Sequence, residues 1–200
     1  MTYPHVRAAV TAGLLVLGAS STSTAQWTVS AGVRSPRFSG GAVEPGTDRS
    51  LLPYRPTIVE VGVGHVGGRF GGELRLHYAS SSLALEGDEA VAAIKDALTV
   101  YGITPSISLP ISHLGPAGLL RVSAGPLVEV WKLPDIGSHW RVGITASIAL
   151  EVPFGGHWAG SARLGGAVSP SPFAAEDLEP PLEPRTLWRR EAAASLQYRL

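Results

Sequence analysis

The feature that most constrains the fold of this chain is a two-residue alternation of apolar and polar side chains that recurs along almost its whole length. In segment 140–154, apolar residues hold the even positions from Trp140 to Phe154, and mostly small or polar residues hold the odd ones. Successive side chains of a β-strand point to opposite faces, so this period predicts strands. Eight segments carry it: 27–34, 59–64, 70–78, 101–111, 120–130, 140–154, 158–168 and 188–200.

The connections between these segments differ in length in a regular way. Tight turns are expected at 66–68, 114–118 and 155–156. Longer connections are expected at 39–55, 82–97 and 170–185, with a shorter one at 134–139. Short turns on one rim and long loops on the other are typical of transmembrane barrels. The sequence therefore predicts an all-β, antiparallel up-and-down transmembrane barrel of eight strands, with both chain ends on the short-turn rim.

The first 25 residues have the composition of a secretory signal. Arg7 precedes an apolar run from Ala8 to Ala19, and Ser23 and Ala25 are small residues at the positions that signal peptidases read. We expect cleavage after Ala25 and a single barrel domain over 26–200. The alternative, a membrane anchor, would need about 20 apolar residues, and this run is shorter.

Bulk composition excludes several classes of protein. The formal net charge is +0, which gives no electrostatic footprint for nucleic acid. The chain has no cysteine, so a disulfide framework and a thiolate metal site are both impossible. The 24 glycines and 16 prolines suit many short strands joined by turns.

Aromatic residues gather where the predicted strands end, as expected for two membrane-interface girdles. Near the short-turn rim lie Trp27, Phe70, Phe154, Trp158 and Tyr198. Near the long-loop rim lie Phe38, Tyr78, Tyr101, Trp131, Trp140 and Trp188, of which Trp131 falls on the polar face of its strand.

The polar faces carry both signs of charge in similar number. Unpaired charges inside a narrow barrel would each cost several kcal/mol, on the order of the desolvation penalty of a buried ion, so a balanced set predicts pairing across the lumen. The expected lumen network consists of Glu60, Glu73, Arg75, His77, Arg121, Glu129, Arg141, Glu151, Arg163, Arg189, Glu191 and Arg199. In a soluble sheet the same residues would face water.

These features together resemble the small eight-stranded outer-membrane barrels of the outer-membrane protein A type. The resemblance covers 26–200 and rests on alternation, loop rhythm, girdles and a final strand, 192–200. It implies an outer-membrane location, contact with outer-membrane lipids and delivery by the barrel-insertion machinery. Such barrels usually end on an aromatic residue; this chain ends on Leu200, with Tyr198 on the same face.

Three local features qualify this expectation. Pro105 and Pro126 fall inside strands and each remove a ladder hydrogen bond, so we expect a bulge at each. Segment 88–97 is expected to form a short helix, and 170–184, with five prolines, a stiff extended loop.

Catalytic and metal-binding patterns are weak. His77 with Ser80, and Ser138 with His139, are the close Ser/His neighbours, and neither has the His-x-Ser spacing of the lipid A deacylases that resemble the chain in architecture. The His139-Trp140 and His157-Trp158 pairs are expected at the membrane interface. No metal-ligand spacing of the His-x-x-x-His kind occurs, and we expect no enzyme activity, cofactor or metal.

The sequence therefore favours a structural or interaction protein of the outer membrane, with a lumen largely closed by Glu and Arg. Three alternatives stay open: a lipid-modifying enzyme, a soluble periplasmic β-barrel that binds a small apolar ligand, and a narrow pore. A pore would use the glycines of the polar faces, namely Gly62, Gly64, Gly102, Gly125, Gly143 and Gly165. Acidic residues cluster in two of the long connections, at 86–89 and 176–183, where solvation explains them and no calcium-loop pattern is present.

Overall fold

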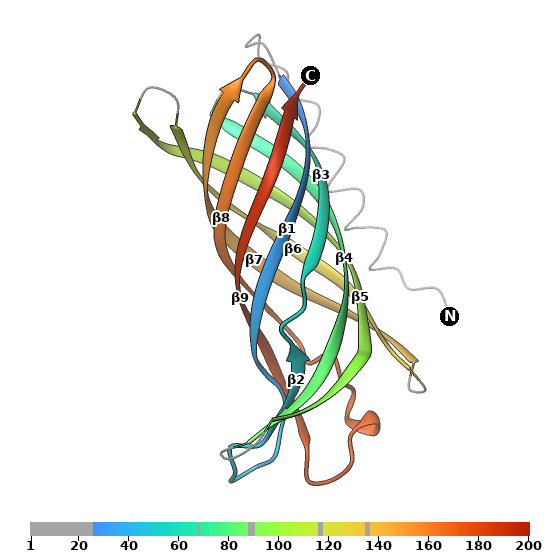
Figure 1. The fold of residues 1–200 in the computed structure, drawn as a ribbon. Coiled ribbons are helices and arrows are strands. Elements are labelled where there is room, and N and C mark those ends of the chain that lie inside the picture. Colours follow the sequence, from blue (N-terminus) through green and yellow to red (C-terminus); the bar gives the residue numbers. More distant parts are fainter. Residues whose placement is uncertain (1–25, 68, 88–90, 116–117, 135–136) are drawn as a thin grey trace, which may run out of the picture.

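The computed structural model describes residues 26–67, 69–87, 91–115, 118–134 and 137–200. The predicted signal segment, 1–25, lies outside these ranges. The described chain is a single antiparallel sheet rolled into a barrel (Figure 1). Its strands are β1 (Gln26–Val43), β2 (Ser50–Tyr54), β3 (Ile58–Gly67), β4 (Phe70–Glu86), β5 (Val91–Leu114), β6 (Gly118–Leu133), β7 (Gly137–Gly155), β8 (Trp158–Ser169) and β9 (Glu183–Arg199).

The barrel wall has eight strand positions, as the sequence predicts, because β2 and β3 together occupy one of them. Both pair antiparallel to β1 and to β4, and only the bend at 55–57 separates them. Arg55 has a φ of 44° in this bend, which interrupts the ladder. The all-β antiparallel barrel is thus confirmed.

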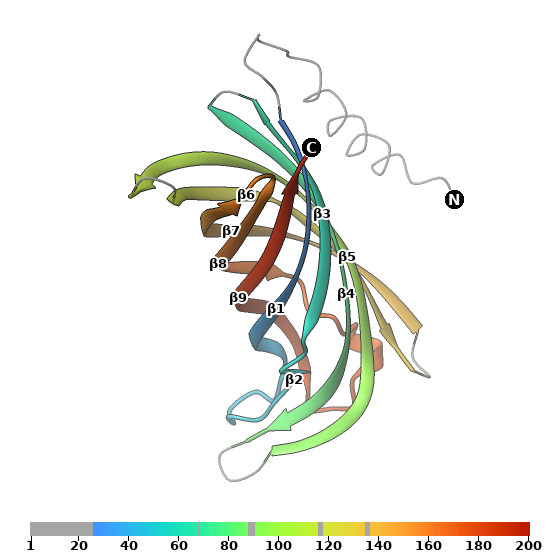
Figure 2. The same cartoon turned by 45° about the horizontal axis from the view of Figure 1, so that its top comes forward.

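The strands are tilted, and their register closes the ring. Following the cross-strand partners of Trp27 once around the barrel, through each strand from β3 to β9, leads back to β1 at Arg37. Arg37 is ten residues farther along β1 than Trp27. A stagger of this size in eight strands requires a tilt of roughly 40° to the barrel axis, and Figure 2 shows the strands curving around that axis. An interior of this size is just wide enough to be filled by side chains.

One end of the barrel carries tight turns and the other carries longer segments. The turn end holds the β3–β4, β5–β6 and β7–β8 connections, together with Gln26 and the C-terminus (Figure 1). The loop end holds β2 and the β8–β9 connection, which contains a short 3₁₀ turn at Ala175–Asp177. The latter connection is therefore not uniformly extended, in contrast to the expectation.

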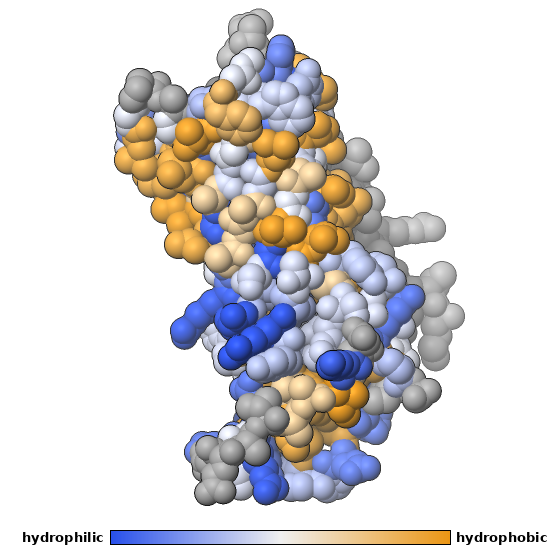
Figure 3. All heavy atoms as spheres, viewed as in Figure 1, coloured by the Kyte–Doolittle hydropathy of each residue, from blue (hydrophilic) through white to orange (hydrophobic). Residues whose placement is uncertain are grey.

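In the turn-end half of the barrel, the apolar faces of the strands point outward, as the outer-membrane interpretation requires. Large apolar side chains on the outside are strongly exposed, for example Ile144 at 65% and Leu164 at 63%. The opposite face is buried even where it is charged, as in Arg34 at 4%. On the face seen in Figure 3, most exposed apolar side chains form an orange belt across the half of the barrel that includes the turn end. A soluble barrel with its apolar face inward would have the reverse arrangement.

The belt is uneven around the barrel. On β7 the outward apolar positions run from Phe154 to Trp140, whereas on β1 they run only from Trp27 to Val33 and are followed by Ser35 and Arg37. The outward aromatic residues mark its two edges. Trp27, Phe70, Phe154, Trp158 and Tyr198 lie toward the turn end, and Tyr78, Tyr101, Trp140 and Trp188 lie toward the loop end.

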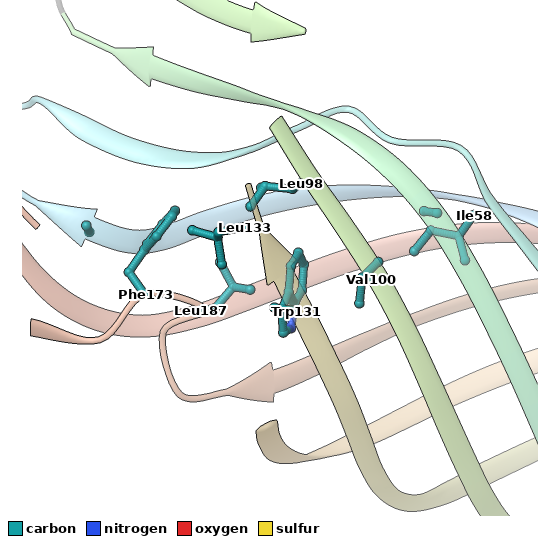
Figure 4. Packing of buried hydrophobic residues seen from close by; sticks show 9 residues of the cluster. Ile58, Leu98, Val100, Trp131, Leu133, Phe173 and Leu187 are labelled. Atoms are coloured by element: carbon teal, nitrogen blue, oxygen red, sulfur yellow. The ribbon is translucent and has the colours of Figure 1, made fainter. Parts of the chain in front are cut away.

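Inside the loop end, an apolar cluster lies within the barrel (Figure 4). Trp131 is 1% exposed and packs edge-on against Phe38, with ring centroids 6.2 Å apart. Placing Trp131 and Phe38 in the outer girdle was therefore wrong, because both side chains point inward. The buried members of the cluster are Ala42, Ile58, Ala79, Leu98, Val100, Trp131, Leu133, Phe173 and Leu187.

Two local expectations are corrected. Residues 91–97 form the start of β5 and not a helix, because they pair with β4 at Val91↔Glu86 through Ile94↔Leu83. No register shift occurs at Pro105 or Pro126: the β5–β6 ladder resumes at Ile107↔Ala124 in the register it had at Ile103↔Val128. The two prolines face each other across this gap. The N–H groups that the two prolines lack are therefore both missing at the same point of the β5–β6 ladder, and the strands need no bulge there.

Candidate functional site: the ion network inside the barrel

Inward-facing charged residues from six strands meet near the middle of the barrel. Each of these side chains faces the lumen because successive side chains of a strand point to opposite faces, and the residues on either side of it face outward. The central group comprises Arg34 of β1, Glu60 of β3, His77 of β4, Glu129 of β6, Arg163 of β8, and Arg189 and Glu191 of β9. The side chains of all seven are between 0% and 8% exposed.

Glu129 is the acceptor of three donors. Its Oε1 accepts from Arg189 Nη1 at 2.6 Å and lies 3.0 Å from His77 Nε2. Its Oε2 accepts from the indole Nε1 of Trp131 at 3.2 Å. The carboxylate thus joins the charged centre to the apolar cluster at the loop end, and Trp131 satisfies its buried N–H there.

The remaining charges form a continuous chain of ion pairs. Arg189 Nε lies 3.1 Å from Glu191 Oε2, and Arg34 Nη1 donates to the same carboxylate oxygen at 3.1 Å. Arg34 Nε lies 3.5 Å from Glu60 Oε2, and Glu60 Oε1 accepts from Arg163. Three arginines face three glutamates, so the buried charge is balanced and burial leaves no net charge in the lumen.

Two further pairs lie on the turn-end side of this group. Arg121 Nε donates to Glu151 Oε2 at 3.0 Å, and Arg75 Nε lies 3.4 Å from Glu73 Oε2. Glu73 is the most exposed of these four side chains, at 28%.

Glycine makes room for the centre of the network. A Cβ added to Gly102 would overlap the ring of His77 and lie 3.0 Å from Glu129 Cγ. At Gly62 an added Cβ would lie 2.6 Å from Ser30 Oγ and 3.1 Å from Arg75 Cγ. At these two positions, neighbouring side chains occupy the space that the glycines leave.

Not every residue of the expected set lies in the network. Arg141 donates to the carbonyl groups of Ser171 and Trp140, so it fastens the β8–β9 connection to β7. Arg199 lies at the turn end, where its backbone N–H donates to the carbonyl of His157 at 2.8 Å.

Sequence reasoning missed Arg34 and the role of Trp131. Arg34 follows Val33 in a clear alternation, so its place on the polar face was visible, and pairing it with Glu60 and Glu191 required the three-dimensional register. Trp131 was visible as an aromatic residue out of phase with its neighbours, which is the signal that separates a lumen residue from a girdle residue.

The structure separates the two Ser/His neighbours. His77 points into the lumen and contacts Glu129, whereas Ser80 lies on the outward face of β4. His139 Nε2 lies 2.8 Å from Asp177 Oδ2, and Ser138 faces the other side of β7. In the described ranges, no group of three or more metal-ligating side chains forms.

A hollow of about 460 Å³ opens on the outer surface where the wall is incomplete. The β7–β8 ladder ends at Ile144↔Val168, although β7 continues to Gly137. The lining of the hollow includes Val142, Ile144, Val168, Pro170 and Thr186. The β8–β9 connection closes the lumen side of this gap.

No helix in the described part of the chain has the length and apolar character needed to cross a bilayer. Comparison with protein-family models found no match, and comparison with curated proteins found none either.

Solved structures do match, and they define the class of fold. The chain superposes on Neisserial surface protein A with a TM-score of 0.57 at 8% identity, over 88% of this chain and 99% of that one. It superposes on the outer membrane protein OprG from Pseudomonas aeruginosa with a TM-score of 0.54 at 9% identity, over 88% and 95%. A major outer membrane protein from Thermus thermophilus gives 0.51 at 13% identity, over 89% and 100%. The fold is therefore that of the small outer-membrane β-barrels.

Proposed function

We propose that this protein is an outer-membrane barrel with a closed lumen, which serves as a structural or interaction module and not as a channel. The observation that carries the proposal is that two layers of side chains lie inside the barrel, one after the other along its axis. The balanced ion network spans the middle, and the apolar cluster around Trp131 and Leu98 lies within the loop end.

The two layers oppose the passage of ions for different physical reasons. An ion that enters the network has to compete with buried, oppositely charged pairs, and breaking such pairs costs about 3–5 kcal/mol, of the order measured for buried salt bridges. An ion that enters the apolar layer loses its hydration with no polar group in return. Together they make steady ion flow unfavourable.

The other candidate functions have less support. A lipid-modifying hydrolase would need a nucleophile beside a base; Glu129 contacts His77 Nε2, and the other ring nitrogen, Nδ1, has no hydroxyl or other hydrogen-bond partner among the described residues. A pore through the lumen glycines would need open space at Gly62 and Gly102, where neighbouring side chains lie. Membrane lipids are the expected partners of the outer belt, and the barrel-insertion machinery is the expected partner during assembly.

Conductance across a planar bilayer tests the closed lumen. We expect the purified, refolded barrel to show no steady single-channel current. The double variant Glu129→Ser/Arg189→Ser removes two facing charges at the centre and is expected to give a small ohmic conductance. The double variant Thr57→Ala/Ser35→Ala, on the outside, is the matched control and should stay silent. A steady open current from the unmodified protein would contradict the proposal and favour the narrow pore.

A further inference from the structure

Two arginines stand side by side on the outside of the barrel at the loop-end edge of the apolar belt. Arg37 of β1 and Arg190 of β9 are direct cross-strand partners, and both are exposed. Arg190 lies between Ala192 and Trp188 on the outward face of β9, which places it inside the line of outward aromatic residues. Figure 3 shows hydrophilic side chains directly below the orange belt on the face where β9 and β1 lie.

Within the described ranges, neither arginine has a carboxylate partner. Arg37 Nη1 donates to the carbonyl of Pro36 at 3.2 Å, and Arg190 forms no ion pair. Two other exposed arginines at the loop end have carboxylate partners, whereas the guanidinium of Arg55 lies over the ring of Tyr54, 5.0 Å from its centroid. Arg49 Nη1 lies 3.5 Å from Glu44 Oε2, and Arg185 Nη2 lies 3.2 Å from Glu183 Oε2. Like charges directly opposite each other in a sheet are destabilising, so the Arg37–Arg190 pair is unfavourable unless an anion lies between them.

The surroundings of the pair define what kind of anion fits. On the turn-end side the neighbouring outward residues are small, namely Ser35 and Ala192, and Val33 follows beyond Ser35. On the loop-end side Trp188 is 59% exposed, a position typical of a membrane interface. An anion at this place therefore meets two guanidinium groups, with small and apolar side chains on one side and an interfacial tryptophan on the other.

We propose that Arg37 and Arg190 bind the headgroup phosphate of a phosphorylated lipid in the outer leaflet, with the acyl chains of that lipid on the adjoining apolar face. Guanidinium groups bind phosphate through paired, charge-assisted hydrogen bonds, and long arginine side chains reach from an apolar surface to the headgroup layer. The inference rests on the membrane placement made under the proposed function.

Binding of lipid A to the detergent-solubilised full barrel tests this site. The probe is fluorescent lipid A with its phosphates, compared with the same lipid A after the phosphates are removed. The variant is Arg37→Gln/Arg190→Gln, and the matched control is Arg49→Gln/Arg185→Gln, which removes the same charge from exposed loop-end positions. We expect the affinity of the variant for the phosphorylated lipid to fall about tenfold to a hundredfold, as the loss of two charged hydrogen bonds predicts.

The control variant should bind as the unmodified protein does, and the dephosphorylated lipid should bind all three proteins equally weakly. Equal losses in both double variants would overturn the site in favour of general charge attraction, and no loss in either would overturn it outright. Full competition by millimolar inorganic phosphate would overturn the lipid as its source. These outcomes are separate from a failure of the proposed function, which would appear as current through the lumen or as recovery of the protein in the soluble fraction.

Discussion

At the scale of single residues, Glu129 is the side chain on which the interior depends most. It lies at the junction of the ion network and the apolar cluster, and its three partners come from three strands, β4, β6 and β9. Because its side chain is 1% exposed, water cannot replace those partners if the carboxylate is lost.

Replacing Glu129 with Gln should destabilise the barrel strongly. The change leaves Arg189 buried with only Glu191 beside it, and uncompensated buried charges of this kind cost about 3–5 kcal/mol. Glu183→Gln is the matched control: the side chains of Glu183 and its partner Arg185 are 57% and 59% exposed, so water compensates Arg185 and the loss should be about 1 kcal/mol or less. Urea unfolding in lipid vesicles measures both free energies. Equal losses would show that Glu129 has no special place in the network.

The same scale shows what alternation can and cannot predict. Which face each residue occupies follows from odd and even positions, and the outward exposure of Leu74, Val142 and Leu196 agrees with that. Which charges pair depends on the stagger between strands. Arg34 and Glu191 are 157 residues apart in the chain, and only closure of β9 onto β1 brings them together.

At the scale of elements, the β8–β9 connection acts as a strap across an incomplete part of the wall. It begins where the β7–β8 ladder stops, and two contacts fasten it to β7: Arg141 with the Ser171 carbonyl, and His139 with Asp177. Asp177 Oδ2 also accepts from the backbone N–H of Ala174 at 2.8 Å, which holds the short 3₁₀ turn.

Asp177→Asn should loosen this strap without unfolding the barrel. The amide weakens both the contact to His139 and the N–H acceptor at Ala174, so we expect faster amide hydrogen exchange over 172–178. Glu176→Gln, a change at an exposed neighbour, should leave the exchange rates as they are. Exchange measured by mass spectrometry on the folded protein gives the comparison. Unchanged protection in the Asp177 variant would mean that packing of Phe173 in the apolar cluster alone holds the strap.

Element boundaries were the hardest part to predict from the sequence. Residues 91–97 contain Ala and charged residues suited to a helix, and no alternation marks them, yet pairing with β4 makes them a strand. Local propensity was overridden there by a partner 5 to 11 residues away across a hairpin. The prolines at 105 and 126 were located correctly in strands, but their positions opposite each other are a property of the register between β5 and β6 and not of either segment.

At the scale of the whole molecule, the two ends of the barrel should lie on different sides of the membrane. The chain has no native cysteine, so single cysteines report this directly. We expect Asp48→Cys, at the loop end, to react with a membrane-impermeant maleimide on intact cells. Arg69→Cys, at the turn end, should react only after the outer membrane is permeabilised. Both positions are exposed, which makes each the control for the other. The reverse pattern would invert the topology.

The uneven apolar belt has a consequence for the membrane itself. On the β7 side the belt is long enough for a full hydrocarbon layer, whereas on the β1 side it ends at Val33, about half as far along the strand. A bilayer of uniform thickness cannot match the apolar belt on both sides. The barrel must therefore tilt, or the bilayer beside β1 must become thinner, and each adjustment costs fractions of a kcal/mol per Å of mismatch. Either adjustment makes the β1 flank of the barrel meet the membrane differently from the β7 flank. Neighbouring proteins and lipids would meet it with a preferred orientation.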